Sequence, residues 1–312
     1  MRSARPSINA VYHAAVVLRQ LEYLSALAEE RHFGRAAAAC HITQPALSVA
    51  IRKLEAELGV ELVQRGRNYD DLTPQGRELL RWARQTLASV DGLVSAAARL
   101  TGELRGRLRL GVIPTALPTV AELTAPLLAA NPQVDLEIRS LSSTEIGAQL
   151  ESFRIDAGIT YLDNEPLGRL RGRPLYTESY ALLSGEEGDA ADLPWAALDG
   201  SSLCLLSPEM QNRRIVEAAL ERSGARARAR IESNSISALL SFARAGWSSI
   251  VSRTWLSLYG VPEGMRAVRL VEPEVAYTIG IVTRDTELLP PVVGALLDSA
   301  PAYSAAEAGA PS

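Results

Sequence analysis

Cysteine is scarce in this chain of 312 residues: Cys40 and Cys204 are the only two, and they lie far apart in the sequence. Two isolated cysteines form neither a disulfide framework nor the ligand spacing of a zinc site. The sequence therefore predicts no bound metal and no cofactor, and the low cysteine content favours a reduced cytoplasm.

Long apolar runs are missing as well, since no segment reaches the roughly 18 uninterrupted apolar residues that a membrane helix requires. Arg2 and Arg5 precede a mildly apolar stretch, but Asn9 and His13 interrupt it, and no small-residue cleavage site closes it. We expect no secretory signal, no membrane partner and a cytoplasmic location.

Catalytic signatures are also absent. The sequence contains no G-x-S-x-G elbow, no phosphate-binding P-loop and no dinucleotide fingerprint. Its three histidines, His13, His32 and His41, all lie near the N-terminus, which excludes a histidine-based catalytic site in the rest of the chain. We therefore expect no catalytic residues. An enzyme, or an α/β protein that binds only a small molecule, is kept as an alternative.

Lysine is almost absent, with Lys53 the only one, and the formal net charge is −4, which is not the overall balance of a nucleic-acid binder. Whether the chain binds nucleic acid therefore depends on how its charge is distributed locally. The chain is long and rich in apolar residues. Its 312 residues, 47% of them hydrophobic, suffice for two globular domains with their own cores.

The first segment has the pattern of three helices. Apolar residues recur at helical spacing over Leu18–Leu27 and predict a helix that ends near Glu30. The small residues of Arg35–Cys40 predict a second, short helix. Thr43 then supplies an N-cap for a third helix, which Gly59 ends.

The third predicted helix has two different faces. One face is apolar and consists of Leu47, Ile51, Leu54 and Leu58. The opposite face includes Pro45, Val49, Arg52 and Lys53, flanked by Gln44 and Ser48. No acidic residue lies between Thr43 and Leu54, so the surface is locally basic, and one face can pack into a core while the other enters a groove.

Six segments follow one another in a recognisable order: residues 18–24, 33–37, 43–48, 51–55, 58–59 and 72–76, which read LRQLEYL, FGRAA, TQPALS, IRKLE, LG and LTPQG. Together they resemble the winged helix-turn-helix of LysR-type transcriptional regulators. The resemblance implies a DNA-binding domain over residues 18–76, preceded by a mobile N-terminal extension, residues 1–17.

By this resemblance, residues 43–55 form the recognition helix in the major groove of double-stranded DNA. Glutamine can pair with adenine and arginine with guanine, so Gln44 and Arg52 are candidates for base contacts. Contact with phosphate alone is the alternative for Arg52 and Lys53. The residues implied in DNA binding are Thr43, Gln44, Pro45, Ser48, Arg52, Lys53 and, in the wing, Arg65 and Arg67.

The sequence departs from the family pattern at three places. Val49–Ala50 stands where polar or basic side chains are common, and Val63 where phenylalanine is usual. Asp70 and Asp71 add negative charge near the tip of the wing. These departures argue against base contacts from the Val49 turn and weaken the expected contact of the wing with phosphate.

From Thr73 to about Leu100 a helical pattern continues with a long apolar stripe, which no globular core is near enough to absorb. The stripe consists of Leu79, Leu80, Ala83, Leu87, Val90, Val94 and Ala97. In the family this segment, residues 77–102, is an antiparallel dimerisation helix, so we expect a homodimer and, as the family implies, a homotetramer.

After Gly102 strand-like and helix-like segments alternate, which predicts a parallel sheet flanked by helices. The expected strands are 108–112, 136–140, 157–160, 180–183, 203–206, 229–231, 249–251 and 279–283, and the expected helices are 120–130, 145–152, 213–222, 236–245 and one after Pro290. The pattern resembles the family's α/β effector domain, with two lobes of periplasmic-binding-protein-like topology. The implied bounds are 107–303 for the domain, about 107–175 and 275–303 for lobe I, about 176–274 for lobe II, and 304–312 for a mobile tail.

Ligands of such folds bind where strand ends and helix N-termini meet, because free N–H groups there favour anions. Four polar loops, at 114–115, 142–144, 210–213 and 233–235, have suitable residues. The residues predicted to bind the effector are Thr115, Ser142, Ser143, Tyr161, Gln211, Asn212, Arg213, Asn234 and Ser235. Arg213 or Arg214 is expected to supply the counter-charge for a carboxylate, with surface exposure as the alternative for Arg214. Ordinary helix capping is the alternative for each serine or threonine, and packing at the mouth of the cleft is the alternative for Tyr161.

The function implied is that of a DNA-binding regulator whose promoter binding or activation responds to a small, anionic metabolite held between the lobes. RNA polymerase is a further candidate partner. A solute-binding transport protein would share the lobes, but it would need an export signal and would carry no helix-turn-helix. Residues 161–167 and 210–214 are similar to those of family members associated with formate-oxidation genes.

Overall fold

The computed structural model describes residues 16–65, 69–163, 165–185 and 189–300. The expected C-terminal tail and all but residues 16 and 17 of the expected N-terminal extension lie outside these ranges. The chain divides into two compact units with a boundary after Val94, and each unit is described by itself.

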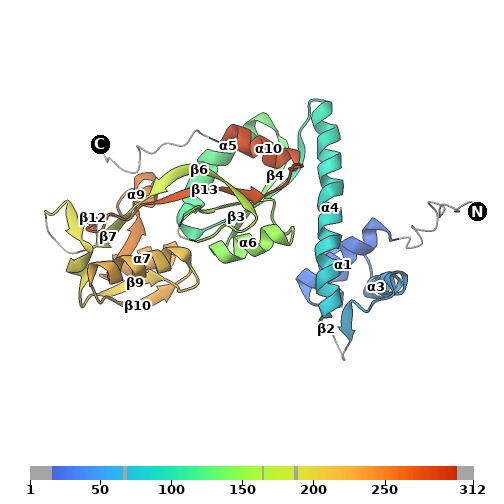
Figure 1. Ribbon diagram of the computed structural model, residues 1–312, viewed down its shortest axis with the longest axis horizontal. Helices are drawn as coiled ribbons and strands as arrows, with labels where there is room; N and C mark the ends of the chain where they lie inside the picture. The colour runs from blue at the N-terminus through green and yellow to red at the C-terminus, as the bar shows by residue number, and fades with distance from the viewer. Residues whose placement is uncertain (1–15, 66–68, 164, 186–188, 301–312) are drawn as a thin grey trace, which may run out of the picture. The chain divides into compact units, whose positions relative to one another are not determined.

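The first unit is a helix-turn-helix followed by a two-stranded wing and the beginning of a long helix (Figure 1). Its elements are α1 (Leu18–Glu30), α2 (Phe33–Ala39), α3 (Gln44–Leu58), β1 (Val63–Arg65), β2 (Tyr69–Leu72) and α4 (Pro74–Leu100). β1 and β2 pair antiparallel. The predicted first helix and the predicted long helix are confirmed, and the short second helix begins two residues earlier than expected.

Small and aliphatic side chains form the core of this unit. Ala36 and Ala37 of α2 are fully buried, so α2 lies close to its neighbours, as their lack of bulk predicted. The buried aliphatic residues include Leu24, Leu27, Leu47, Ile51, Leu54, Leu62 and Leu80. The caps of α3 are also as predicted: the hydroxyl of Thr43 accepts the N–H of Ala46 at 3.4 Å, and Gly59 has a left-handed φ of 68°.

The wing and the start of α4 are joined through the side chain of Thr73 and a close backbone approach at Gly76. The Thr73 hydroxyl donates to the carbonyl of Glu61 at 2.6 Å, and the same oxygen accepts the N–H of Gly76 at 2.8 Å. A Cβ atom on Gly76 would lie 2.1 Å from the carbonyl oxygen of Leu62, so only glycine permits this approach.

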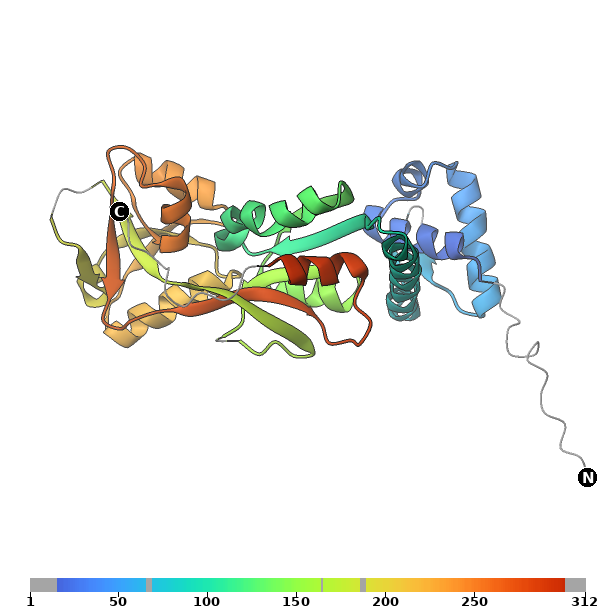
Figure 2. The same cartoon turned by 90° about the horizontal axis from the view of Figure 1, so that it is seen from above.

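The second unit contains two mixed sheets that form its two lobes (Figures 1 and 2). The five-stranded sheet of lobe I has the order β4 (Gln133–Ser140), β3 (Arg105–Val112), β5 (Ala157–Tyr161), β13 (Tyr277–Arg284) and β6 (Leu170–Glu178). Its helical elements are η2 (Pro114–Thr119), α5 (Val120–Ala130), α6 (Ser143–Glu151) and α10 (Pro291–Ser299).

Lobe II is built on a six-stranded sheet. The strand order is β10 (Arg228–Ser233), β9 (Ser202–Leu206), β11 (Ser248–Ser252), β7 (Tyr180–Ser184), β12 (Arg266–Val271) and β8 (Asp192–Pro194). Its helical elements are η3 (Trp195–Leu198), α7 (Gln211–Ser223), α8 (Ile236–Arg244) and α9 (Arg253–Tyr259). The expected strands and helices of both lobes are present, whereas β6, β8, β12 and α9 were not predicted.

The sheets are not purely parallel, which corrects the expectation from the alternating pattern. β3 is parallel to β4 and β5, but β13 runs antiparallel to both β5 and β6, and β7 runs antiparallel to β11 and β12. The cause is the path of the chain, which leaves lobe I at Ser179 and returns to it over residues 272–276. β13 enters the sheet of lobe I on this return and runs against β5 and β6.

Two glycines set the position of α6 on the sheet of lobe I. Gly111 of β3 and Gly158 of β5 are paired in register. A Cβ atom would lie 2.6 Å from the side chain of Ile155 at the first glycine and 2.4 Å from that of Ile146 at the second. Because neither glycine has a side chain, α6 can pack closely there, and this packing positions its N-terminal residue Ser143.

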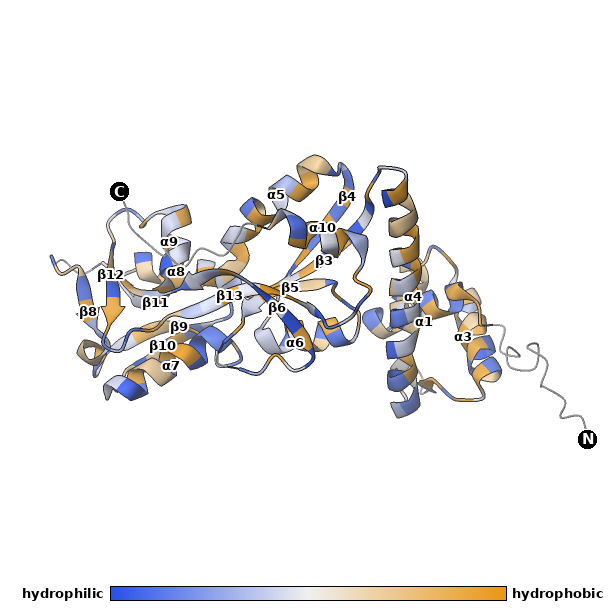
Figure 3. Ribbon diagram, turned by 45° about the horizontal axis from the view of Figure 1, so that its top comes forward, coloured by the Kyte–Doolittle hydropathy of each residue, from blue (hydrophilic) through white to orange (hydrophobic). Residues whose placement is uncertain are grey.

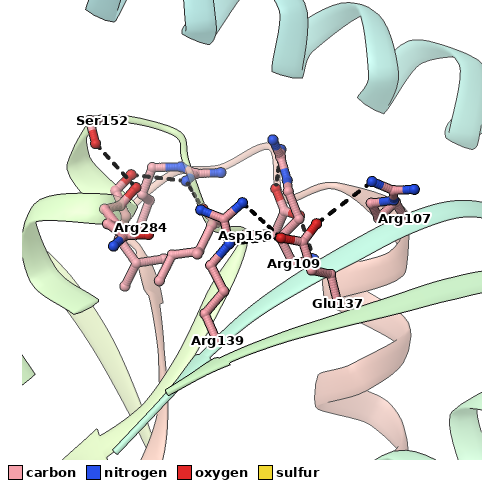
Figure 4. Close-up of polar contacts among 10 residues, drawn as sticks. Arg107, Arg109, Glu137, Arg139, Ser152, Asp156 and Arg284 are labelled. Carbon is pink, nitrogen blue, oxygen red and sulfur yellow. Dashed lines mark hydrogen bonds and ion pairs between the residues drawn. The ribbon is translucent and has the colours of Figure 1, made fainter. Parts of the chain in front are cut away.

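A cluster of arginines and carboxylates joins the strands of lobe I at the end where β3 begins (Figure 4). The guanidinium of Arg109 forms two hydrogen bonds with the carboxylate of Asp156, at 2.8 and 3.0 Å. Arg284 donates to the carbonyls of Leu150 and Ile155, at 3.0 and 3.1 Å. Burial, together with the like charge of Arg109, lowers the pKa of Arg284. These contacts connect β3, β13 and the segment that leads into β5.

Candidate DNA-binding surface and effector cleft

Helix α3 presents the predicted polar face to solvent. Leu47, Ile51 and Leu54 are fully buried. The side chains of Gln44, Pro45, Val49, Arg52 and Lys53 are exposed, and Ser48 is half-buried. The exposed face therefore combines an amide, a guanidinium and an ammonium group, the donors that read base edges and phosphates.

Two residues of this face differ in their contacts. The ammonium of Lys53 lies 3.7 Å from the carboxylate of Glu57 one turn later, so its charge is partly compensated. Arg52 has no ion pair within the described ranges of the chain. Arg52 is therefore the better-placed cation for a direct contact with a base.

The wing carries both predicted arginines, but neither side chain is described. Arg65 lies at the end of β1, and Arg67 lies outside the described residues. The carboxylate of Asp71 lies 3.0 Å from Arg77 and 3.7 Å from Arg31. The negative charge of Asp71, one of the two acids that the sequence places beside the wing, is thus compensated by arginines of the same unit.

Between the two lobes lies a cleft of about 1140 Å³. Its walls carry three of the predicted effector residues, Ser142 from lobe I and Asn234 and Ser235 from lobe II. The other residues of the wall are Pro114, Leu117, Pro118, Ser140, Thr144, Glu145, Glu209, Met210, Arg214, Ile236, Ser237, Trp255 and Tyr259.

A narrow recess of about 10 Å³ shares Pro114, Ser142 and Met210 with this cleft. Its remaining wall contains most of the other predicted residues, namely Thr115, Ser143, Tyr161, Gln211 and Asn212, together with Ile113 and Leu206. Thr115, Tyr161, Gln211 and Asn212 are buried. The structure thus brings together eight of the nine residues predicted for the effector, at the floor and walls of one cleft.

Arg213 is the exception. Its guanidinium donates to Glu217 and Glu232, both at 2.8 Å, and to the carbonyl of Leu206 at 2.9 Å, so it holds α7 against β9 and β10. The expectation that Arg213 supplies a counter-charge does not fit this geometry. The next residue, Arg214, lines the cleft, and its Nε lies 2.7 Å from Glu165.

The N-termini of three helices meet at the cleft. Ser142 caps α6, with Oγ accepting the N–H of Glu145 at 3.3 Å and the Glu145 carboxylate accepting the N–H of Ser142 at 2.8 Å. Helices α7 and α8 have no side-chain cap and no acidic residue in their first turns. Their first N–H groups and the positive ends of their dipoles remain available to an anion.

Behind the recess lies a buried acid that the sequence analysis missed. Glu178 is fully buried with Tyr161 and Tyr180, and burial raises the pKa of its carboxyl group. Burial and the neighbouring Glu178 also raise the pKa of Tyr161. A single glutamate near the predicted boundary between the lobes gives no sign of this burial, which arises only when the two lobes enclose it.

Family models match both units of the chain. Residues 18–77 match the bacterial regulatory helix-turn-helix protein, lysR family, and residues 101–304 match the LysR substrate binding domain. The chain belongs to the LysR-type transcriptional regulators. This confirms the predicted winged helix-turn-helix and two-lobed α/β fold, the role in DNA-binding regulation of transcription, and the prediction that the chain is not an enzyme.

The relatives of this LysR-type regulator include proteins named as activators of hydrogen peroxide-inducible genes. It is 33% identical over 276 residues to the DNA-binding transcriptional dual regulator OxyR of Escherichia coli K12, covering 86% of this chain and 89% of the relative. It is 39% identical over 166 residues to a probable hydrogen peroxide-inducible genes activator of Mycobacterium xenopi, covering 53% and 87%. Neither relative is described in terms of formate oxidation, so that similarity stays a prediction.

Solved structures of the family share the fold. A full-length OxyR variant from Pseudomonas aeruginosa superposes with a TM-score of 0.73 at 27% identity, covering 91% of this chain and 94% of that one. The regulator CbnR in complex with its target DNA superposes with a TM-score of 0.64 at 24% identity, covering 91% and 99%. Within the described ranges of our LysR-type chain, no helix is both long and apolar enough to span a membrane.

Proposed function

We propose that this LysR-type regulator reads double-stranded DNA with the exposed face of α3 and with the wing, and that a small acidic metabolite in the interlobe cleft changes its occupancy of the promoter. It acts in the cytoplasm as a homodimer or homotetramer, and RNA polymerase is a further candidate partner. The domain boundaries and, with the exception of Arg213, the site residues expected from the sequence remain part of this proposal.

The observation that carries the effector proposal is the pair of uncapped helix N-termini in lobe II. Helix α7 follows Met210 and helix α8 follows Ser235, and both of these residues line the cleft. Unpaired N–H groups at a helix start, together with the helix dipole, stabilise a negative charge placed against them. Arg214 also lines the cleft but is paired with Glu165, and Glu145 and Glu209 lie on the same wall, so the helix N-termini alone carry the proposal.

Coupling to DNA follows from the position of this cleft between two lobes. A ligand that contacts both lobes binds one lobe arrangement more tightly than others and therefore shifts the population toward it. Differential affinities of about 1–3 kcal/mol are typical of such coupling, enough to change promoter occupancy several-fold or more.

A peroxide response through thiol chemistry fits this chain poorly, although several relatives are named for peroxide induction. The reactive form of cysteine is the thiolate. Cys204 is buried within β9, and burial raises the pKa of its thiol. The other cysteine, Cys40, lies in the DNA-binding unit, and its pKa is likewise raised, by burial and by Glu22. We therefore propose an acid rather than an oxidant as the signal.

The test combines a ligand screen with a variant that fills the anion site. Small carboxylates (acetate, lactate, succinate and benzoate) are screened by thermal shift, and promoter occupancy is then measured by fluorescence anisotropy on the intergenic DNA beside the gene. Ser235→Asp places a carboxylate at the start of α8, so it should weaken an acidic ligand at least about fivefold. Ser257→Asp on the exposed face of α9 is the matched control.

Two results would contradict the proposal. One is a screen in which no carboxylate changes either the melting temperature or the promoter occupancy. The other is an occupancy that responds to hydrogen peroxide in the wild type and loses this response in Cys204→Ser, which would make the thiol the sensor.

A further inference from the structure

A second pocket adjoins the effector cleft on lobe II, and no family property stated above assigns a role to it. This side pocket has a volume of about 410 Å³ and shares Ser237, Trp255 and Tyr259 with the main cleft. Its other residues are Leu240, Ser241, Arg244, Gly260 and Pro262. Because the two spaces have common walls, one molecule can occupy both.

One wall of the side pocket is a single face of α8. Ser237, Leu240, Ser241 and Arg244 recur at the spacing i, i+3, i+4 and i+7, and all four line the pocket. The buried residues Leu239 and Ala243 attach the other side of α8 to the sheet. The pocket-facing side is thus held in place by the core of lobe II.

The opposite wall is aromatic. Trp255 and Tyr259 of α9 have ring centroids 5.0 Å apart with planes inclined at 40°. Trp255 is half-buried against the core cluster under α8 and α9, whereas Tyr259 is exposed. Figure 3 shows the two helices next to each other in lobe II. Aromatic faces of this kind bind planar, apolar groups through offset or edge contacts.

The charge of the side pocket is positive. Arg244 is the only charged residue that lines it, and no ion pair of Arg244 occurs in the described part of the chain. Ser237 and Arg244 are seven positions apart, which is about 10 Å along an α-helix. A molecule that touches both ends of α8 must therefore have two polar ends about that far apart.

We propose that the side pocket and the main cleft together bind an elongated aromatic dicarboxylate. This inference rests on the proposed acid-binding function of the main cleft and names the class of acid. One carboxylate lies at the uncapped N-terminus of α8, the aromatic body lies against Trp255 and Tyr259, and the second carboxylate pairs with Arg244.

The experiment uses the full-length protein and four probes that differ by one feature each. 4-Carboxycinnamate and biphenyl-4,4′-dicarboxylate carry an aromatic body and two carboxylates. Cinnamate lacks the second carboxylate, and suberate lacks the aromatic body. Affinities are measured by isothermal titration calorimetry on the wild type and on Arg244→Gln, Trp255→Ala and Trp255→Phe, with Arg230→Gln on β10 as the control for lost surface charge.

The expected pattern separates the two contacts. Arg244→Gln should weaken the aromatic dicarboxylates about tenfold, the usual effect of losing a hydrogen bond between charged groups, and leave cinnamate unchanged. Trp255→Ala should weaken both aromatic dicarboxylates and cinnamate about fivefold and leave suberate unchanged, with Trp255→Phe restoring most of the affinity. Arg230→Gln should behave as the wild type with all four probes.

Several outcomes overturn the proposal. It fails if the aromatic dicarboxylates bind no more tightly than suberate. It also fails if Arg244→Gln affects cinnamate and 4-carboxycinnamate equally. A further outcome is that suberate binds and is weakened by Ser235→Asp while the aromatic probes bind no more tightly than suberate. In that case the proposal for the side pocket is wrong and the proposal that the main cleft binds an acid stands. If none of the four probes binds, the side-pocket proposal fails, and the screen of small carboxylates decides separately whether the main cleft binds an acid. A change of assembly mass in Trp255→Ala by sedimentation would make this face an interface between copies instead.

Discussion

The phenolic hydroxyl of Tyr161 donates a hydrogen bond to Oε1 of Glu178, and both side chains are buried between the lobes. Tyr161 ends β5 of lobe I, and Glu178 is the last residue of β6 before the chain crosses to lobe II. From lobe II, Tyr180 donates to the same oxygen at 3.1 Å, and Asn212 donates to the Tyr161 hydroxyl at 3.3 Å. One carboxyl group thus connects both lobes directly behind the recess.

The raised pKa of Glu178 makes stability depend on pH. An unfolded glutamate ionises near pH 4.3, whereas the folded one keeps its proton to higher pH because its charged form is desolvated. The free energy of unfolding should therefore fall as the pH rises from about 4.3 through the folded pKa. Above the folded pKa the fall is complete. Urea denaturation at a series of pH values measures this fall.

Glu178→Gln provides the control for this prediction. Glutamine keeps the shape and one accepting oxygen but cannot ionise, so the fall attributed to Glu178 should disappear. An unchanged pH profile in the variant would assign the dependence to other groups.

Arg52→Ala should weaken binding to the cognate promoter by about 1–3 kcal/mol and binding to random DNA far less, because a base contact carries sequence information. Arg52 is exposed on α3 and has no ion pair within the described ranges. Lys53→Ala is the matched variant, with a residue already near Glu57, and should lower both affinities similarly. If Arg52→Ala loses the same binding free energy on both DNAs, Arg52 contacts phosphate and not a base.

Replacing Leu93 and Val94 by aspartate should separate the dimer. In the isolated chain these residues of α4 are 71% and 53% exposed, which is costly for large apolar side chains unless a partner covers them. Since little of either side chain is packed within the chain itself, the variant should fold. Sedimentation at micromolar concentration gives the mass, and Ser89→Asp on the same helix is the control. A wild type that sediments as a monomer would refute the prediction.

Asp156→Asn should destabilise the second unit by about 1.5–3 kcal/mol, the usual loss for hydrogen bonds to a charged group. Asp156 is buried and accepts from both the guanidinium and the backbone N–H of Arg109. Chemical denaturation measures the change. Glu137→Gln, which removes a more exposed partner of Arg139, should cost less than about 1 kcal/mol. A similar loss in both variants would contradict the assigned role of burial.

Local patterns were enough to predict much of the fold. Periodicity placed α1 and α5 at their bounds, and the cap residues Thr43 and Gly59 placed the ends of α3, because these signals act over a few residues. β6 escaped prediction because Pro174 and the charged residues at its start hide the strand pattern. The antiparallel direction of β13 depends on the route of the chain between the lobes, and no local sequence pattern predicts that route.

The effector site likewise contains some residues that the sequence predicts and others that it does not. Hydroxyl and amide residues near strand ends could be predicted, since strand ends of one lobe gather at one edge. The choice between Arg213 and Arg214 could not, because it depends on Glu217 and Glu232 engaging the first of them. Trp255 and Tyr259 belong to a helix that the sequence analysis did not predict, so their place on the cleft wall emerged only from the structure.

The contact between Gly76 and Leu62 has a mechanical consequence. The wing is fastened to the first turn of α4 by Thr73, by Gly76 and by Arg77, whose guanidinium also donates to the carbonyl of Leu72 at 2.7 Å. The wing and the DNA-proximal end of α4 therefore turn as one rigid lever. If α4 rotates about its own axis, the wing turns through the same angle, so under the proposed mode of DNA binding a rotation of the helix would displace the contact between the wing and DNA.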